Sequence, residues 1–341
     1  VNGLWTFFGG AGTLANFREI ALPIGISFYT FQALSYVVDV YRGETQVQKS
    51  YINMLLYVSF FPQLIAGPIV KYHDIAMQMD RRYVDVDKFV YGIRRFICGL
   101  GKKVLLSNTF AEVVDQVYQK DLTEVASSLL WLTALLYMLQ IYFDFSGYSD
   151  MAIGLGKMFG FDFLENFNLP YRALSVRDFW RRWHISLSSW FRDYLYIPLG
   201  GSRKGTAKTY RNLLIVFFMT GLWHGAGWSF ILWGLYHGFF LVLERAFLGK
   251  ALERMKPVVG WLYTLAVVFF GWILFRAESL ETAVVFIKNM FVHHHSVVMT
   301  ASYVNARLLT ILAAGLILCG PGQMAAEHFG IRPKKEGDPV T

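Results

Sequence analysis

The chain has 341 residues, of which 55% are hydrophobic and only 16% are charged, and its formal net charge is +8. Soluble globular domains average about 25% charged residues, so this composition argues against a soluble protein and indicates one built for lipid. The basic residues cluster in loops between apolar runs, which the positive-inside rule of membrane proteins explains better than nucleic-acid binding does.

Several long stretches contain no Lys, Arg, Asp or Glu, and each is close to or longer than the roughly 20 residues that cross a bilayer as a helix. The sequence therefore predicts an all-α, polytopic transmembrane bundle. The chain begins at Val1 rather than Met, and we expect residues 1–341 to form one membrane-embedded domain whose earlier spans are missing. Cys98 and Cys319 stand alone, so no structural disulfide is expected. The charge-free stretches are residues 20–38, 50–70, 125–143, 213–243, 257–275 and 308–326.

The first third of the chain alternates apolar and charged segments. Pro23 is expected to open a helix that ends in the polar residues 39–43, because proline is well tolerated at a helix start. A second helix is expected over residues 51–66, ended by the breaker pair Gly67-Pro68. The charged residues return in 72–103, which is typical of an amphipathic or interfacial region.

Two carboxylates follow the apolar stretch 125–143. Asp144 lies among aromatic residues at the end of that stretch, where a carboxylate needs a cationic or hydrogen-bonding partner, so we interpret it as a functional candidate. Asp150 comes after a Ser-Gly pair that suggests a bend. We expect it to cap a new helix over residues 151–159.

Residues 175–196 carry an arginine-rich and aromatic pattern. On a single helix the polar residues would form one narrow stripe and the apolar residues another, nearly opposite. The pattern fits an interfacial helix whose arginines contact headgroups, or a helix whose polar face lines a cavity. The polar stripe contains Arg177, Arg181, His184, Ser188 and Arg192, and the apolar stripe contains Phe179, Trp183, Leu187, Trp190 and Tyr194.

The stretch 213–243 is too long for one upright span, and it must tilt, bend or break. Glycines loosen residues 221–228, where His224 stands between Trp223 and Trp228. An ionisable imidazole at membrane depth is a functional hypothesis by default. His237 is expected to be a hydrogen-bonded, helix-packing histidine. The histidine run 293–295 is expected to be a loop rather than a metal site, because adjacent residues do not share a helical face.

Two motifs, Trp-Arg-Arg-Trp-His-Ile-Ser-Leu at residues 180–187 and Gly-Leu-Trp-His-Gly at residues 221–225, resemble the membrane-bound O-acyltransferase family. The form is similar to its bacterial alginate O-acetyltransferase branch, and the similarity extends over residues 22–292. The resemblance implies interrupted and interfacial helices around a central reaction tunnel, with further spans before residue 22. It also implies that His224 is the essential histidine and that His184 is a second active-site residue.

The resemblance implies acetyl transfer to hydroxyls of an exported polysaccharide such as alginate, in the bacterial inner membrane. His224 would act as general base and His184 would orient or protonate, while Arg181 and Arg177 would stabilise an oxyanion or hold an anionic donor or uronate. The donor would be acetyl-CoA or an acyl intermediate derived from it. No tightly bound cofactor, metal or nucleic acid is expected. A periplasmic or membrane-anchored acetyltransferase would be a partner. Supporting roles fall to Asp144, Trp223 and Ser188.

Other interpretations remain open at this point. The acceptor could instead be peptidoglycan, teichoic acid, cellulose or another glycan. A transporter or conduit for acyl groups would also carry intramembrane His, Asp and Arg residues, but transporters often show paired interrupted helices in two repeated halves. This chain shows one such interruption and no evident second copy, which favours the enzyme. A scaffold for a polysaccharide synthase would leave both histidines dispensable.

Overall fold

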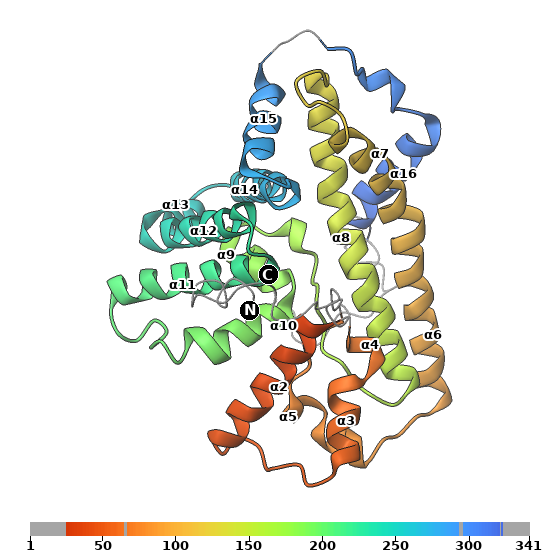
Figure 1. Cartoon of the computed structure of the whole chain (residues 1–341), viewed down its shortest axis with the longest axis vertical. Coiled ribbons are helices and arrows are strands. Elements are labelled where there is room, and N and C mark those ends of the chain that lie inside the picture. Colours follow the sequence, from red (N-terminus) through yellow and green to blue (C-terminus); the bar gives the residue numbers. More distant parts are fainter. Residues whose placement is uncertain (1–24, 65–66, 293–295, 321, 323–341) are drawn as a thin grey trace, which may run out of the picture.

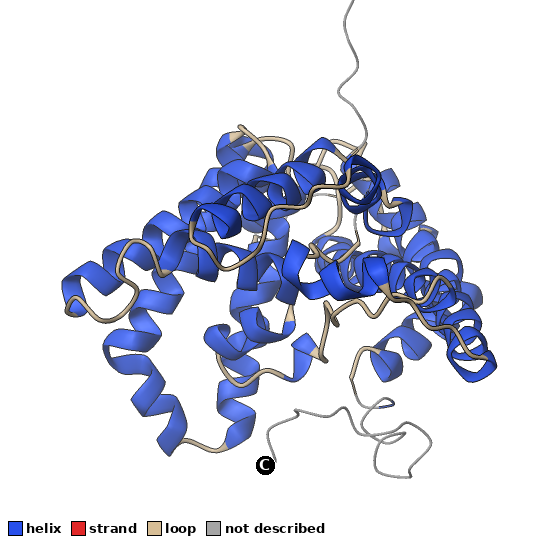
Figure 2. Ribbon diagram, turned by 90° about the horizontal axis from the view of Figure 1, so that it is seen from below, coloured by secondary structure: helices blue, strands red, loops and turns tan. Residues whose placement is uncertain are grey.

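The structure is a computed structural model that describes residues 25–64, 67–292, 296–320 and 322. Within these residues the chain is helical and has no β-strand, although Val125 and Val298 form one isolated parallel bridge (Figure 2). The predicted all-α class is therefore confirmed. In the part of the chain that the structure describes, three helices are long and apolar enough to cross a bilayer, and they span Ser127–Met158, Trp228–Arg254 and Pro257–Arg276. The predicted helix start at Pro23, the histidine run 293–295 and the end of the stretch 308–326 lie outside the described residues.

A column of long helices forms one side of the molecule (Figure 1). Helix α8 (Ser127–Met158), with 32 residues, packs against α6 (Val86–Gly101), the π-helical turn η1 (Lys102–Ser107) and α7 (Asn108–Tyr118). The backbones of α6 and α8 touch, because a Cβ added to Gly92 would lie 2.6 Å from the carbonyl oxygen of Gly154. A Cβ on Gly99 would likewise lie 2.5 Å from the carbonyl oxygen of Gly147. Glycine is needed at these positions for close approach.

Helix α8 corrects the prediction that Asp150 begins a new helix. The helix passes through Ser146 and Gly147 without ending, since Gly147 serves the contact with α6 rather than a turn. Asp150 lies within α8, where its Oδ1 accepts a hydrogen bond of 2.7 Å from Nη2 of Arg95. Its Oδ2 accepts one of 2.6 Å from Nζ of Lys102. The carboxylate therefore joins α8 to α6 and η1 and caps no helix.

The N-terminal helices gather at the end of the column where α8 finishes (Figure 1). They are α2 (Ile26–Tyr41), α3 (Tyr51–Ser59), α4 (Phe61–Leu64) and α5 (Tyr72–Asp80), and α2 ends at the polar segment 39–43 as predicted. A small hydrophobic core joins them to α8 and the segment after it. Its members are Tyr57, Phe60, Val70, Tyr72, Ile75, Met79, Ile153, Phe161 and Phe163.

The predicted break in the stretch 213–243 is confirmed. Helix α11 (Thr206–His224) ends at His224, α12 begins at Trp228 and runs to Leu243, and the glycine-containing segment 225–227 connects them. The two helices form an antiparallel hairpin, because a Cβ on Gly221 would lie 2.4 Å from the carbonyl oxygen of Phe230. The chain continues through η4 (Glu244–Leu248), α13 (Gly249–Arg254), α14 (Pro257–Arg276), α15 (Leu280–Phe291), η5 (Thr300–Ser302) and α16 (Ala306–Leu318).

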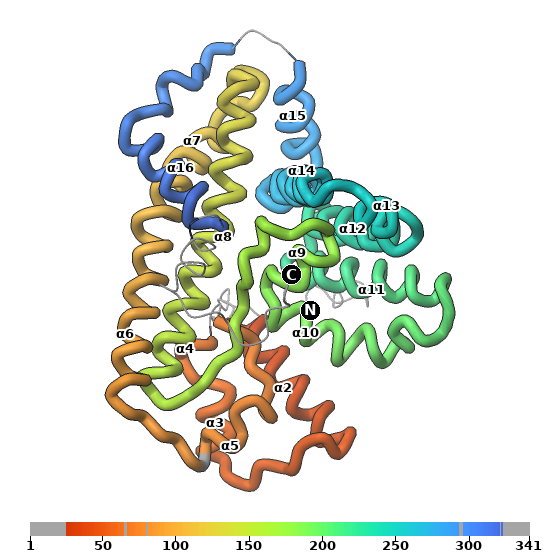
Figure 3. Tube along the Cα trace, turned by 180° about the vertical axis from the view of Figure 1, so that it is seen from behind, coloured from red at the N-terminus to blue at the C-terminus, as the bar shows by residue number. Residues whose placement is uncertain are grey.

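The segment between α8 and α11 runs between the column and the α11–α12 hairpin, as seen from behind in Figure 3. It contains η2 (Pro170–Arg172), α9 (Val176–Arg182), α10 (Ile185–Phe191) and the π-helical turn η3 (Arg192–Tyr196). The prediction of one helix over residues 175–196 is therefore wrong. The helix breaks at Trp183 and His184, and His184 adopts a left-handed conformation with φ of 45°.

The cause of this break is contact with a distant part of the chain. The backbone N–H of Ile185 donates to the carbonyl of Asn166 at 3.0 Å, and the N–H of Asn168 donates to the carbonyl of Arg182 at 2.9 Å. These bonds hold the break against the loop that follows α8. The side chain of Ser175 caps α9 by accepting a hydrogen bond from the backbone N–H of Asp178. A helix therefore does begin at the start of the predicted segment 175–196.

Candidate active site

His184 is buried at the break between α9 and α10, with 3% of its surface exposed. Its Nδ1 lies 3.1 Å from Oδ1 of Asn166, a fully buried residue of the loop between α8 and η2. The ring of Phe145 from α8 packs edge-on against the imidazole, with ring centroids 4.5 Å apart. The sequence predicted that His184 lies on a polar helix face with arginines. Because the helix breaks there, the side chain instead lies among aromatic residues in the interior.

His224 is the last residue of α11, directly before the reversal of the chain. Aromatic rings from three helices surround it. The ring centroids of Trp223, Phe275 and Trp233 lie 4.6, 5.0 and 5.2 Å from that of His224. No ion pair of His184 or His224 is found within the described residues, and a charged imidazolium would be costly among such rings. Both imidazoles are therefore suited to act as neutral bases or hydrogen-bond partners.

Trp223 joins the two histidines. Its ring lies 4.6 Å from His224 and 6.4 Å from His184, measured between centroids, and it stacks on Phe31 of α2 at 5.4 Å. The two sequence motifs, 40 positions apart, thus meet at one indole. The indole Nε1 of Trp223 and Nε2 of His184 are buried and make no hydrogen bond within the described residues. Buried polar atoms are usually paired, so these two are available to a polar ligand.

The predicted arginines line a cavity of about 370 Å³ beside this centre, between α9, α10 and α11. Residues 175–196 do not form the single predicted helix, yet four of the five members of the polar stripe line this cavity. His184 is the exception. The cavity is lined by Arg177, Arg181, Ser188 and Arg192, together with Trp180, Ile185, Leu187, Ser189, Phe191, Leu213, Val216, Phe217, Thr220 and Leu241.

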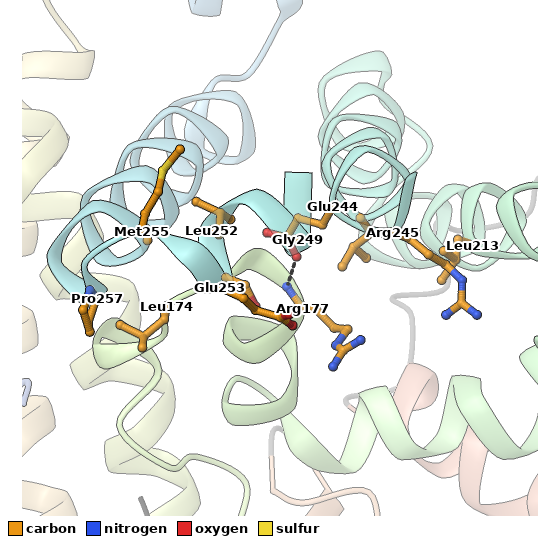
Figure 4. A pocket seen from close by; sticks show the side chains of 13 residues that line it. Leu174, Arg177, Leu213, Glu244, Arg245, Gly249, Leu252, Glu253, Met255 and Pro257 are labelled. Carbon is orange, nitrogen blue, oxygen red and sulfur yellow. Dashed lines mark hydrogen bonds between the residues drawn. The ribbon is translucent and has the colours of Figure 1, made fainter. Parts of the chain in front are cut away.

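Figure 4 shows a second cavity, of about 300 Å³. It shares Arg177, Leu213 and Leu241 with the lining of the first. Its wall contains Glu244, whose carboxylate accepts hydrogen bonds from the backbone N–H groups of Val176 at 2.6 Å and of Arg177 at 3.0 Å. Glu244 therefore satisfies two backbone N–H groups in the first turn of α9. We call the two cavities together the basic recess, and neither His184 nor His224 is among the residues that line it.

Asp144 has the cationic partner that its position predicted, because it forms an ion pair with Lys103 of η1. It also accepts a hydrogen bond of 3.3 Å from Ser107 of the same turn. The structure does not bring its carboxylate into contact with either histidine, although the next residue, Phe145, touches His184. A role for Asp144 in binding substrate stays a prediction.

His237 of α12 is buried and packs against Trp180, Trp233 and Tyr236, with ring centroids between 5.0 and 5.3 Å away. The predicted packing role is confirmed. The predicted hydrogen bond is wrong, since neither ring nitrogen has a partner within the described residues. Gly271 of α14 makes room for the ring, because a Cβ there would lie 2.6 Å from Nε2.

The sequence reasoning missed Asn166, Ser186 and Trp233. Asn166 and Ser186 bind to each other and to the His184 region, and Trp233 lies between His224 and His237. Trp233 falls in the predicted apolar stretch and carried no separate signal. A further cavity of about 1030 Å³ between α8, α14 and α16 is mainly apolar, and none of the predicted site residues lines it.

Comparison with known proteins gives the same family as the motifs. The model of the membrane-bound O-acyltransferase family matches residues 44–283. The chain is 50% identical over 273 residues to a probable alginate O-acetylase AlgI of Pseudomonas aeruginosa, which covers 80% of this chain and 52% of that protein. A probable alginate O-acetylase AlgI of Azotobacter vinelandii is 49% identical over 265 residues, 78% of this chain and 53% of that protein.

A peptidoglycan O-acetyltransferase of Helicobacter pylori is 40% identical over 302 residues, which cover 80% of this chain and 57% of that protein. The chain thus spans little more than half the length of these curated relatives.

Proposed function

The chain belongs to the membrane-bound O-acyltransferase family, and we propose that its histidine pair transfers an acetyl group to hydroxyls of an exported polysaccharide such as alginate. One observation carries this proposal. His184 and His224 come from separate motifs, yet both lie near the ring of Trp223 in an aromatic setting. The similarity to alginate O-acetylases at about half identity supports the choice of acceptor.

His224 takes the proton from the attacking hydroxyl as its oxygen forms a bond to the acyl carbon. The bond between that carbon and the leaving atom of the donor then breaks, and the proton passes from His224 to the leaving atom. The donor is an acyl thioester such as acetyl-CoA, or an acyl intermediate derived from it. His184, whose ring also lies near Trp223, holds the acceptor.

The oxyanion that forms during this step needs a donor close to both histidines. Trp223 supplies one, since its buried Nε1–H has no partner within the described residues. Arg177 and Arg181 line the basic recess, which neither histidine lines. We therefore assign oxyanion stabilisation to Trp223 and assign to the two arginines the binding of an anionic donor, through charge-assisted hydrogen bonds.

The protein acts in a membrane, as its family and its three long apolar helices indicate. We place it in the bacterial inner membrane as a multi-pass protein, with a periplasmic or membrane-anchored acetyltransferase as partner. The central reaction tunnel implied by the resemblance belongs to this proposal, and we assign the basic recess to it as the site of the anionic donor.

The test uses the full-length protein in a host that lacks its own polysaccharide acetylation. Wild type is compared with His224→Ala and His184→Ala, and with His73→Ala as a control, because His73 is an exposed histidine that contacts Asp39 and Asp74. Ester-linked acetyl on the exported polymer and the amount of protein in the membrane are measured. We expect acetylation to be lost in His224→Ala and kept in His73→Ala at equal protein levels. Undiminished acetylation in both active-site variants would favour a conduit or a scaffold.

A second acceptor, peptidoglycan, is favoured by the Helicobacter pylori relative, which is 40% identical. Measurements in the same host distinguish peptidoglycan from an exported polysaccharide as the acceptor. Acetyl esters on purified muropeptides, with none on the exported polysaccharide, would assign peptidoglycan as the acceptor and leave the role of His224 unchanged.

A further inference from the structure

Asn166 is fully buried, and its side-chain amide lies at the centre of a small hydrogen-bond network. Its Oδ1 accepts from the backbone N–H of Ser186 at 3.2 Å and from the hydroxyl of Ser186 at 2.9 Å. It also lies 3.1 Å from Nδ1 of His184. On its other side, Nδ2 donates to the hydroxyl of Ser149 in α8 at 3.1 Å. The amide thus connects α8 to the break that carries His184.

The backbone N–H of Ser186 fixes which end of the amide faces His184. A backbone N–H is always a donor, so the atom opposite it must be the amide oxygen and not the amide nitrogen. The hydroxyl of Ser186 agrees with this assignment. It accepts a hydrogen bond of 3.0 Å from the backbone N–H of Ile69, which leaves its proton for Oδ1 of Asn166. The orientation of Asn166 is therefore set by groups that do not titrate.

We propose that Asn166 is a positioning residue that fixes His184 in the Nδ1-protonated tautomer, so that Nε2 of His184 accepts a hydrogen bond from the acyl acceptor. An amide oxygen can only accept, and the ring nitrogen facing it must carry the proton. A neutral imidazole has one N–H, so Nε2 keeps its lone pair. That atom is buried and has no partner within the described residues.

This tautomer limits the role of His184. The part of His184 in acyl transfer rests on the proposed function. In its neutral form His184 has no proton on Nε2 to give to a leaving group, so it holds the acceptor instead of protonating. A sugar offers neighbouring hydroxyls. One can donate its hydrogen bond to Nε2 of His184 while its neighbour loses a proton to His224 and attacks the acyl carbon. The proton of the first hydroxyl stays in place throughout.

The direct test is nitrogen NMR of the full-length protein in lipid nanodiscs, with nitrogen-15 in its histidines. The difference between wild type and His184→Gln isolates the signals of His184. We expect a protonated Nδ1 and an unprotonated Nε2 in the wild type. A protonated Nε2 with an unprotonated Nδ1 would overturn the proposal without any reference to activity.

Three variants extend the test to acyl transfer. Asn166→Asp keeps an acceptor oxygen facing Nδ1, and we expect it to retain the tautomer and most of the acetylation. Asn166→Leu removes the oxygen at similar volume, and we expect both tautomers to appear and acetylation to fall about 100-fold or more, in line with other sites where a histidine tautomer is lost. Ser149→Ala is the control, since it removes only the contact on the Nδ2 side, and it should keep both tautomer and activity.

The outcomes separate this inference from the proposed function. Equal loss of acetylation in Asn166→Asp and Asn166→Leu, both present in the membrane at wild-type level, would overturn the positioning role. A wild-type protein that shows the expected tautomer but transfers no acetyl group would defeat the proposed function and leave the structural role of Asn166 in place.

Discussion

Gly221 of α11 and Phe230 of α12 are in direct backbone contact, since a Cβ on Gly221 would lie 2.4 Å from the carbonyl oxygen of Phe230. His224 lies one turn beyond this contact, so the crossing of the two helices sets the position of the imidazole. The position of the His224 imidazole therefore depends on Gly221, a residue that has no side chain.

Replacing Gly221 with alanine should push the hairpin apart. We expect Gly221→Ala to lower the free energy of unfolding by about 1–3 kcal/mol, the range for overpacking, and to reduce acetylation by displacing His224. Thermal unfolding of the full-length protein in detergent measures the first effect. Gly101→Ala is the control, because a Cβ there has no atom within 4 Å and the residue is helical. Gly101→Ala should leave the free energy of unfolding unchanged or raise it slightly. An equal loss of stability in both variants would show that the contact of Gly221 with Phe230 is not the cause.

The ion pair between Arg95 and Asp150 should be structural. Their side chains are 11% and 15% exposed, and removing one partner from such a pair typically costs about 3 kcal/mol. We expect Asp150→Ala to lower the melting temperature markedly. Asp162→Ala is the matched control, because this carboxylate is 48% exposed and pairs with Lys157, and its loss should cost at most about 1 kcal/mol. Similar melting temperatures in the two variants would show that Asp150 is not a structural anchor.

His237 should tolerate an apolar replacement. Its ring makes no hydrogen bond within the described residues and lies among Trp180, Trp233 and Tyr236. Replacing a buried unpaired polar side chain by an apolar one of similar size removes a desolvation cost, so His237→Leu should keep or raise the melting temperature and keep acetylation. Loss of acetylation at a normal protein level would give His237 a part in the chemistry.

Arg181 should act on the donor rather than on the chemical step. In Arg181→Gln we expect the KM for acetyl-CoA to rise about 10-fold or more with kcat little changed, because one charge-assisted hydrogen bond contributes about 1.5–3 kcal/mol. Arg203→Gln, in the exposed turn before α11, is the control. The measurement uses membranes that contain the full-length protein. A fall in kcat with an unchanged KM would move Arg181 from donor binding to the transition state.

Acid should weaken the contact between η3 and the N-terminal helices. Burial raises the pKa of Asp193, but hydrogen bonds from Arg192 and Lys71 outweigh it and hold the pKa below its ordinary value. A carboxylate with a depressed pKa adds stability that is full above its unfolded value, near 3.9, and is lost as the pH falls through the folded value. The melting temperatures of wild type and Asp193→Asn should therefore differ at pH 7, begin to converge below about pH 4, and become equal only below the folded pKa. A constant difference would assign the stabilisation to another group.

The sequence was informative where one local feature determines the structure. Three glycines within residues 221–228 predicted the break that ends α11 at His224. The apolar stretches 125–143 and 257–275 predicted parts of α8 and α14. In each case the determinant lies inside the segment itself, as a glycine cluster or a run of apolar residues.

The predictions were wrong where contacts between segments distant in sequence determine the local structure. The break at His184 depends on backbone bonds to Asn166 and Asn168, which helical periodicity cannot detect. Asp150 resembled a cap because Gly147 precedes it, but that glycine serves the crossing with α6. Asn166 itself had no pattern to reveal it, since its role depends on Ser186 and His184 arriving from another part of the chain.

The left-handed backbone of His184, with φ of 45°, affects how mutagenesis at this position should be interpreted. Asparagine and histidine enter this conformation more readily than most residues, whereas other side chains pay a backbone cost there. An alanine at position 184 thus removes the ring and also strains the chain, and the two effects appear together. Asparagine removes the imidazole base with less strain than alanine. A difference between the alanine and asparagine variants would measure how much of the apparent loss belongs to the backbone.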